Sequence, residues 1–370
     1  MNQMYDMIIV GGGIIGNAIA HFLSERGYKI AVVEKGKIAS EASYAAAGLL
    51  GVQAEWDEYD PLFDLARKSR AMFKPLSNQL REKTGIDIGY EEKGIYRIAQ
   101  SDEAAEKLME IMKWQNETGE ESHFLSGAEL REREPLISEA VVAAVYHPND
   151  GHVIAPELAK AFAHSAARSG ADIFEETEVV DIIISNHRVT GVVTSNGVME
   201  SENIIIASGA WSTKLLGHFD KTWGTYPVKG EMIAVTSFKP LLKIPVFEDG
   251  FYIAPKRGGR YLIGATVVPH TYDKAVHVQS IQTSLERAIH ILPELKDATW
   301  DTTWAGLRPQ SNHGMPYIGK HPEIEGLYTC TGHFRNGILL SAISGKYMAD
   351  LIEGKQSNDL LSSFILEGSK

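Results

Sequence analysis

The stretch of sequence that decides the fold is residues 7–16, Met-Ile-Ile-Val-Gly-Gly-Gly-Ile-Ile-Gly. Residues 5–10 are a short, mainly apolar run, which predicts a buried strand. The glycines that follow have the spacing Gly-x-Gly-x-x-Gly. Gly11 permits a tight turn, Gly13 lets the backbone approach a pyrophosphate, and Gly16 allows a helix to pack closely on a strand. We therefore expect a phosphate-binding turn between a strand and a helix.

The residues after this turn complete a βαβ unit. Apolar side chains between Ile15 and Leu23 recur at helical spacing, and the helix is expected to end near Gly27. Residues 29–33 predict a second strand, and Glu34 follows about 20 residues beyond the first glycine. A carboxylate there accepts hydrogen bonds from ribose hydroxyls and repels a 2′-phosphate, which disfavours NADP. FAD and NAD both remain possible at this point.

Composition and charge narrow the functional class. The chain has 370 residues, enough for two domains, and a net charge of -12, which disfavours binding to nucleic acid. Its one cysteine, Cys330, excludes an intrachain disulfide or a multi-cysteine metal site, and we predict no metal. No apolar run is long enough for a transmembrane segment. Asp6 and the lack of a preceding basic segment argue against a signal peptide, so we expect a cytoplasmic protein.

Two later patches suggest a cofactor larger than NAD. Residues 40–50 are crowded with small side chains, which leave room for a large group. Residues 203–207 predict a strand that breaks into small residues at 208–212, where a strand end can pass under a dinucleotide. An ordinary strand-to-helix turn would explain the second patch equally well.

A third patch lies near the C-terminus and favours a flavin. Residues 327–331 predict a strand that leads into glycine-rich residues 332–340 and then a helical stretch, 343–352. The amides and positive dipole of such a helix start can stabilise negative charge on a reduced flavin. A nicotinamide ring gains no such charge, so FAD is preferred.

These patches, in this order, resemble the D-amino-acid oxidase and sarcosine oxidase superfamily, and most closely the bacterial glycine oxidases of thiamine biosynthesis. The resemblance covers essentially the whole chain, and its most specific pieces are residues 11–16, 45–48, 227–231, 252–255, 305–309 and 332–337. It implies FAD-dependent oxidation of glycine, and also of sarcosine and small D-amino acids, by hydride transfer to flavin N5. The implied products are a 2-oxo acid such as glyoxylate, ammonia or amine, and hydrogen peroxide, with the imine supplied to thiamine thiazole synthesis.

The resemblance also implies a fold and an assembly. We expect an α/β chain in which a Rossmann-like FAD-binding domain is interleaved with a substrate domain built on a mainly antiparallel sheet. The FAD-binding segments are 1–86, 151–219 and 301–370, and the substrate-binding segments are 87–150 and 220–300. Residues 97–130 show a charge-rich helical pattern with Asp102 as the expected N-cap. Relatives imply a homotetramer, and the FAD is expected to be noncovalent because Cys330 does not match the family's attachment position.

Three residues are predicted to bind the substrate. Arg308, within Gly-Leu-Arg-Pro, matches the family's carboxylate-binding arginine, and a guanidinium fork suits two carboxylate oxygens. The Tyr252 hydroxyl can donate to the same carboxylate while its ring forms a wall of the pocket. Arg335 can bind substrate or add positive potential beside the flavin. We assign no acid or base, because hydride transfer requires none, and we interpret His333 as a packing residue of the cofactor loop.

The residues predicted to contact FAD are Gly11, Gly13, Ile14, Ile15, Gly16, Glu34, Lys35, Ala42, Ser43, Ala47, Gly48, Leu49, Val179, Gly209, His333, Phe334, Arg335, Asn336, Gly337, Ile338 and Leu339. Leu49, Gly250 and Val267 are expected near the substrate channel, so the preference among substrates stays open. Alternatives are a sarcosine or D-amino-acid oxidase or dehydrogenase of the same superfamily. Alternatives of another class are an NAD-dependent dehydrogenase and a dinucleotide-binding sensor without catalysis.

Overall fold

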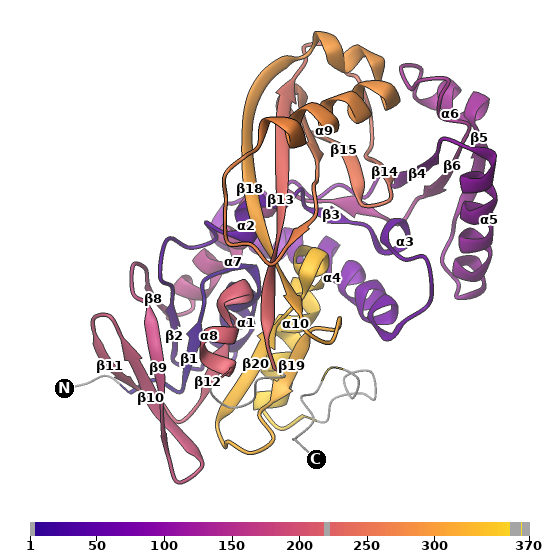
Figure 1. Ribbon diagram of the computed structural model, residues 1–370. Helices are drawn as coiled ribbons and strands as arrows, with labels where there is room; N and C mark the ends of the chain where they lie inside the picture. The colour runs from indigo at the N-terminus through magenta and orange to yellow at the C-terminus, as the bar shows by residue number, and fades with distance from the viewer. Residues whose placement is uncertain (1–3, 218–222, 356–363, 365–370) are drawn as a thin grey trace.

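The structure is a computed structural model that describes residues 4–217, 223–355 and 364. The predicted domain segments also include residues 1–3, 218–222, 356–363 and 365–370, which lie outside the described part. Two large sheets organise the chain, one below the other in Figure 1. No helix among the described residues is long and apolar enough to cross a membrane.

The first sheet has six strands and contains the N-terminal glycine turn. Neighbouring strands run parallel except for β19 and β20, the antiparallel pair at one edge. In spatial order its strands are β19 (Tyr317–Lys320), β20 (Leu327–Thr331), β12 (Ile204–Ile206), β1 (Met7–Val10), β2 (Ile30–Val33) and β8 (Asp172–Phe174). Strands β1 and β2 are buried along their whole length, as expected of parallel strands that are covered on both faces.

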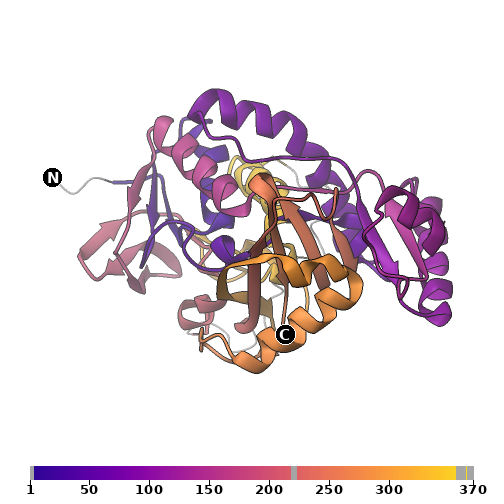
Figure 2. The same ribbon diagram turned by 90° about the horizontal axis from the view of Figure 1, so that it is seen from above.

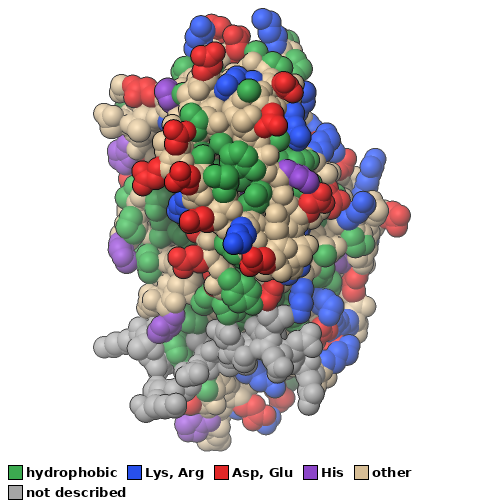
Figure 3. All heavy atoms as spheres, turned by 90° about the vertical axis from the view of Figure 1, so that its right-hand side faces the viewer, with side chains coloured by type: hydrophobic (Ala, Val, Ile, Leu, Met, Phe, Trp, Pro, Cys, Tyr) green, Lys and Arg blue, Asp and Glu red, His purple; other side chains and the backbone are tan. Residues whose placement is uncertain are grey.

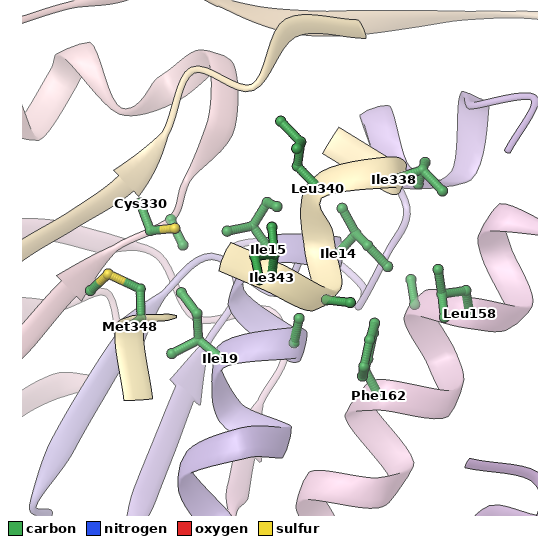
Figure 4. Close-up of a cluster of buried hydrophobic side chains, with 14 of the residues drawn as sticks. Ile14, Ile15, Ile19, Leu158, Phe162, Cys330, Ile338, Leu340, Ile343 and Met348 are labelled. Carbon is green, nitrogen blue, oxygen red and sulfur yellow. The ribbon is translucent and has the colours of Figure 1, made fainter. Parts of the chain in front are cut away.

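Helices cover one face of this sheet and a small sheet covers the other. Helices α1 (Ile14–Ser24), α7 (Ala155–Arg168) and α10 (Gly337–Ile352) share one hydrophobic cluster, whose side chains point toward one another in Figure 4. The opposite face packs against a three-stranded antiparallel sheet. Its strands are β9 (Val179–Ser185), β10 (Arg188–Thr194) and β11 (Gly197–Glu200).

The second large sheet is mainly antiparallel, with one parallel pair, β14 and β4. In order its strands are β17 (Val268–Pro269), β13 (Thr225–Thr236), β16 (Arg260–Gly264), β15 (Phe251–Lys256), β14 (Val246–Glu248), β4 (Ile95–Ala99), β6 (Ala143–His147) and β5 (His123–Ser126), and β18 (Thr299–Ser311) also pairs with β13. Helix α9 (Val278–Ile291) packs on one face. Figure 2 shows α9, in orange, on the opposite side of the molecule from α4 (Pro61–Thr84), in purple.

Alternation along β13 explains how this sheet faces both a core and a pocket. Ile233 and Val235 point into the cluster under α9, whereas Met232 and Ala234 belong to a separate cluster on the opposite face. Glycines 258 and 259 form the connection between β15 and β16. One face of the sheet therefore packs on the core under α9, and the opposite face is available to line the pocket.

The smaller elements complete the chain. They are α2 (Ala42–Ala45), β3 (Leu49–Leu50), α3 (Val52–Glu55), α5 (Asp102–Glu117), α6 (Gly127–Arg133), β7 (Gly151–His152), α8 (Thr213–Leu216), and the 3-10 turns Gly209–Trp211, Arg257–Gly259, Pro293–Asp297 and Phe334–Asn336. On the face shown in Figure 3, acidic and basic side chains are interspersed.

The fold class is confirmed, and some details of the prediction are corrected. The N-cap of α5 is Ser101, not Asp102, because the Ser101 side chain accepts a hydrogen bond from the Ala104 amide. Residues 97–130 contain α5 but also the end of β4, all of β5 and the start of α6, so the predicted helical pattern does not hold over the whole range. Helix α10 begins at Gly337, well before residue 343. The domain boundaries stay a prediction, and β18, which belongs to the second sheet, crosses the one at 300/301.

Candidate active site

One pocket is lined by residues from both large sheets. Its walls include the glycine turn after β1, the small-residue segment around α2, the end of β12 and the start of α10. Strands β13, β15 and β18 complete it. We call the part lined by Gly11, Gly13, Glu34 and Ser43 the dinucleotide region. We call the part lined by Arg308, Tyr252, Glu55 and Arg335 the substrate region.

Backbone shape dominates the dinucleotide region. Gly11 has a φ of 110°, and a Cβ there would lie 2.6 Å from the Ala207 carbonyl oxygen. A Cβ at Gly16 would lie 2.0 Å from the Gly11 carbonyl oxygen. A Cβ at Gly48, whose φ is 77°, would lie 2.3 Å from the Val153 carbonyl oxygen. Larger residues at these positions would force the turn, the helix and the small-residue segment apart.

Glu34 is held in a fixed orientation by the same turn. Its Oε2 accepts a hydrogen bond from the Gly12 amide at 2.7 Å, and its Oε1 accepts one from the Gly36 amide at 2.9 Å. Each oxygen keeps a second acceptor site for a ribose hydroxyl. The Ser43 hydroxyl accepts a hydrogen bond from the Ile14 amide at 2.8 Å, which ties the small-residue segment to the start of α1.

Further predicted cofactor residues gather around this region. Val179, at the start of β9, and Gly209, after β12, both line the pocket. The Lys35 ammonium lies 3.3 Å from the centre of the Trp211 ring, and burial lowers the pKa of Lys35. Trp211 lines the pocket as well, although it was not among the residues predicted to contact FAD.

The C-terminal loop also meets the pocket. His333 is buried, its Nε2 lies 3.0 Å from the Ser344 hydroxyl, and burial lowers the pKa of His333 to about 3. Its imidazole is therefore neutral at ordinary pH, in keeping with a packing role. Gly337 and Ile338 place the N-terminal end of α10 in the pocket wall, and no side chain caps that end. Its free amides can stabilise negative charge on a bound group.

Most residues predicted to contact FAD line this pocket, but Gly16, Asn336 and Leu339 do not. Gly16 packs against the carbonyl of Gly11 instead. Leu339 lies in the core around α1 and α10, and the Asn336 amide donates to the His333 carbonyl at 2.9 Å.

Arg308 is positioned by its two strands. It lies on β18 opposite Val228 of β13, and a Cβ at Gly230 would lie 2.4 Å from its Nη1. Gly230 therefore leaves the space that the guanidinium occupies. Nη1 donates to the Thr266 carbonyl at 3.1 Å, and burial lowers the pKa of Arg308 without removing its charge. No ion pair to Arg308 occurs within the described residues, so the guanidinium can bind a carboxylate.

Tyr252 reaches the same region from β15. Its hydroxyl donates to the Met232 sulfur at 3.1 Å, and burial, with the Glu55 charge adding to it, raises the pKa of Tyr252 to about 12. The hydroxyl therefore remains a donor throughout the physiological pH range. Leu49 and Gly250, two of the predicted channel residues, line the pocket. Val267 does not, and it is 57% exposed.

Glu55 is the charged residue of this region that the sequence analysis missed. It ends the short helix α3, and its Oε2 lies 3.4 Å from the Arg335 Nε. Burial raises the pKa of Glu55, while Arg335 and Arg308 oppose that rise. The local sequence carries no signal for it, because Glu55 belongs to no glycine motif and its charged neighbours come from distant strands and loops.

Asp150 holds α3 in place. Its buried carboxylate accepts hydrogen bonds from the amides of Val52, Gln53 and Ala54 at 2.9 to 3.0 Å, and from the Arg70 guanidinium at 2.7 Å. These bonds satisfy the amides at the start of α3, which would otherwise be unpaired. Asp150 thereby fixes the backbone that presents Glu55.

The pocket fits FAD better than NAD, because it continues beyond the part that would hold a dinucleotide. The dinucleotide region supplies the phosphate turn and the ribose acceptor, and the same pocket extends past the start of α10 to Arg308 and Tyr252. A group bound across it would lie between the uncapped start of α10 and the Arg308 guanidinium. Within the described residues, no cluster of His, Cys, Asp or Glu could hold a metal ion.

Comparison with known proteins agrees with this geometry. Residues 6–351 match the model of the DAO family, described as FAD dependent oxidoreductase. Glycine oxidase of Geobacillus kaustophilus is 44% identical, over 99% of this chain and 97% of that protein. The crystal structure of glycine oxidase from Bacillus cereus superposes with a TM-score of 0.94 at 64% identity, over 98% of this chain and 99% of that one. The bifunctional protein ThiO/ThiG of Synechocystis is 32% identical over 98% of this chain, which spans 54% of its length.

Proposed function

Because the chain belongs to the DAO family of FAD-dependent oxidoreductases, we propose that it oxidises glycine and similar small amino acids. The observation that carries the proposal is Arg308, a half-buried arginine in the pocket wall whose guanidinium occupies the space left by Gly230. A cation placed there selects a substrate with a carboxylate. The similarity to glycine oxidases over nearly the whole chain supports glycine as that substrate.

The mechanism we propose assigns binding and orientation to the protein. Bound FAD supplies the electron acceptor for a hydride from the substrate Cα. Arg308 binds the substrate carboxylate, and the Tyr252 hydroxyl turns from the Met232 sulfur to donate its one proton to the same carboxylate, which fixes the direction of the Cα–H bond. Gly11, Gly13, Glu34 and Ser43 hold the dinucleotide part, and the uncapped start of α10 stabilises negative charge near Gly337.

The products and the wider role are part of the same proposal. Water hydrolyses the imine to a 2-oxo acid, glyoxylate in the case of glycine, and ammonia or an amine, while dioxygen is reduced to hydrogen peroxide. Delivery of the imine to thiamine thiazole synthesis is supported by the similarity to the ThiO/ThiG protein. A cytoplasmic location, noncovalent FAD and a homotetramer also remain predictions.

One experiment distinguishes the proposed function from two alternatives, a different substrate within the superfamily and a sensor without catalysis. The experiment is a peroxide assay with glycine, sarcosine, D-alanine and D-proline, with ammonia or methylamine measured as co-product. We expect glycine to yield peroxide and ammonia. A higher kcat/KM for sarcosine or a D-amino acid would move the substrate assignment within the superfamily. A yellow, FAD-loaded protein that produces no peroxide and reduces no artificial acceptor with any of the four would instead be a dinucleotide-binding sensor.

A further inference from the structure

Glu55 presents an unsatisfied carboxylate to the substrate region. Its side chain is 12% exposed, and within the described residues no group donates a hydrogen bond to its buried Oε2. The Arg335 Nε, at 3.4 Å, provides charge but no hydrogen bond. A buried acceptor without a donor is costly, so Glu55 is stabilised by a ligand that brings a donor.

The surrounding charges indicate which ligand this is. The charged or titratable groups that act on Glu55 are Arg335, Arg308, Asp150 and Arg97, and Tyr252 lies in the same region. Asp150 is already held by Arg70. Arg308 lacks an anionic partner among the described residues, and Glu55 lacks a hydrogen-bond donor. A zwitterionic amino acid brings a carboxylate for the first and an ammonium for the second.

We propose that Glu55 binds the amino group of the substrate and accepts the proton that the ammonium must lose. This inference rests on the proposed function. One N–H bond of the ammonium breaks and an O–H bond forms at the Glu55 carboxylate, which leaves a neutral amine with its lone pair. The proton then passes to solvent. Glu55 is thus a specificity residue for amino acids over simple carboxylic acids.

The α3 helix supports this role structurally. Three backbone amides of α3 are fixed by the Asp150 carboxylate, and Arg70 holds that carboxylate in turn. Asp150 is therefore a positioning residue for Glu55. A helix of only four residues would not hold a carboxylate in place without such an anchor.

The test compares Glu55→Gln with the parent protein for two ligands. Glycine kinetics report amine binding, and a spectral titration of the bound flavin with acetate reports carboxylate binding alone. We expect KM for glycine to rise about 10-fold or more in E55Q, since a hydrogen bond to a charged group is lost. Acetate should bind as well as before or more tightly. Equal weakening for both ligands would mean that Glu55 only maintains the shape of the pocket, and equal tightening would mean that it only neutralises Arg335; either result overturns the proposal.

The pH profile gives a second readout. Because the active form has Glu55 ionised, kcat/KM for glycine should fall as the pH drops through the pKa of Glu55. Burial raises that pKa, so the fall should occur above the ordinary range of a carboxylate. The acid limb should disappear in E55Q, and an unchanged limb overturns the proton-accepting role. Glu134→Gln is the matched control, because burial also raises the pKa of Glu134 and it lies outside the pocket.

Two outcomes keep this test separate from that of the proposed function. If the parent protein oxidises no amino acid, the proposed function fails first. If it oxidises glycine but E55Q keeps the parent KM and acid limb, only the role of Glu55 fails. Should E55Q not retain FAD, Glu55→Asp takes its place. The shorter carboxylate should raise KM and retain the acid limb, and an unchanged KM would overturn the proposal.

Discussion

The dinucleotide region and the substrate region of the pocket are built in different ways. In the first, short segments bring backbone groups together, and glycines at 11, 16 and 48 leave the space for close contact. In the second, single side chains from β15, β18, α3 and the loop before α10 converge. The dinucleotide region depends on the absence of side chains at a few glycines, whereas the substrate region depends on the functional groups of particular side chains.

Because of this difference, we expect substitutions in the two regions to have different effects. A glycine replaced in the dinucleotide region should alter cofactor retention and stability together, because the turn itself must move. A side chain removed from the substrate region should alter substrate binding while the bound flavin stays in place. Three variants, in order of decreasing expected effect, test that separation.

The largest effect is expected for Arg308→Ala. Loss of the half-buried guanidinium that we propose binds the substrate carboxylate should cost about 3 kcal/mol or more, which lowers kcat/KM for glycine by more than about 100-fold. The flavin spectrum should be retained. Steady-state kinetics and absorbance measure the two quantities, with Arg257→Ala as control, since Arg257 pairs with Asp87 at the surface. Unchanged kinetics in R308A would remove Arg308 from the substrate site.

An intermediate effect is expected for Gly11→Ala. A Cβ 2.6 Å from the Ala207 carbonyl oxygen, at a φ of 110°, should destabilise the fold by about 2 kcal/mol and reduce the FAD content of the purified protein. Gly27→Ala is the matched control for the effect of a positive φ alone. Gly27 also has a positive φ, 86°, but no atom lies within 4 Å of the added Cβ, so it should cost only about 1 kcal/mol. Thermal unfolding and flavin release by acid measure both, and similar losses in the two variants would contradict the close-approach argument.

The smallest effect is expected for Tyr252→Phe. Removal of one neutral hydroxyl should lower kcat/KM for glycine about five-fold, equivalent to about 1 kcal/mol. Because the pKa of Tyr252 is raised to about 12, the hydroxyl stays protonated at all lower pH values. The ratio of parent to variant kcat/KM should therefore be constant between about pH 6 and pH 10. A ratio that falls toward 1 as the pH approaches 10 would show that Tyr252 ionises in the working range.

The sequence predicted most of the dinucleotide region because its information is local. The turn, the helix behind it and Glu34 lie within one βαβ unit, so spacing alone indicated their roles, and the FAD-dependent family is confirmed. Arg308 and Tyr252 were found only through resemblance. Glu55 was not found at all, because its significance depends on Arg335 and Arg308, which are hundreds of residues away in the chain.

Local patterns alone determined that this chain forms a mixed α/β dinucleotide-binding fold, because strand, glycine turn and amphipathic helix follow one another directly. Only the tertiary structure decided which charges share the pocket. Strand pairing places Gly230 against Arg308, and Asp150 anchors the helix that presents Glu55. These are contacts between distant segments, and their energies depend on burial and distance, which no local spacing encodes.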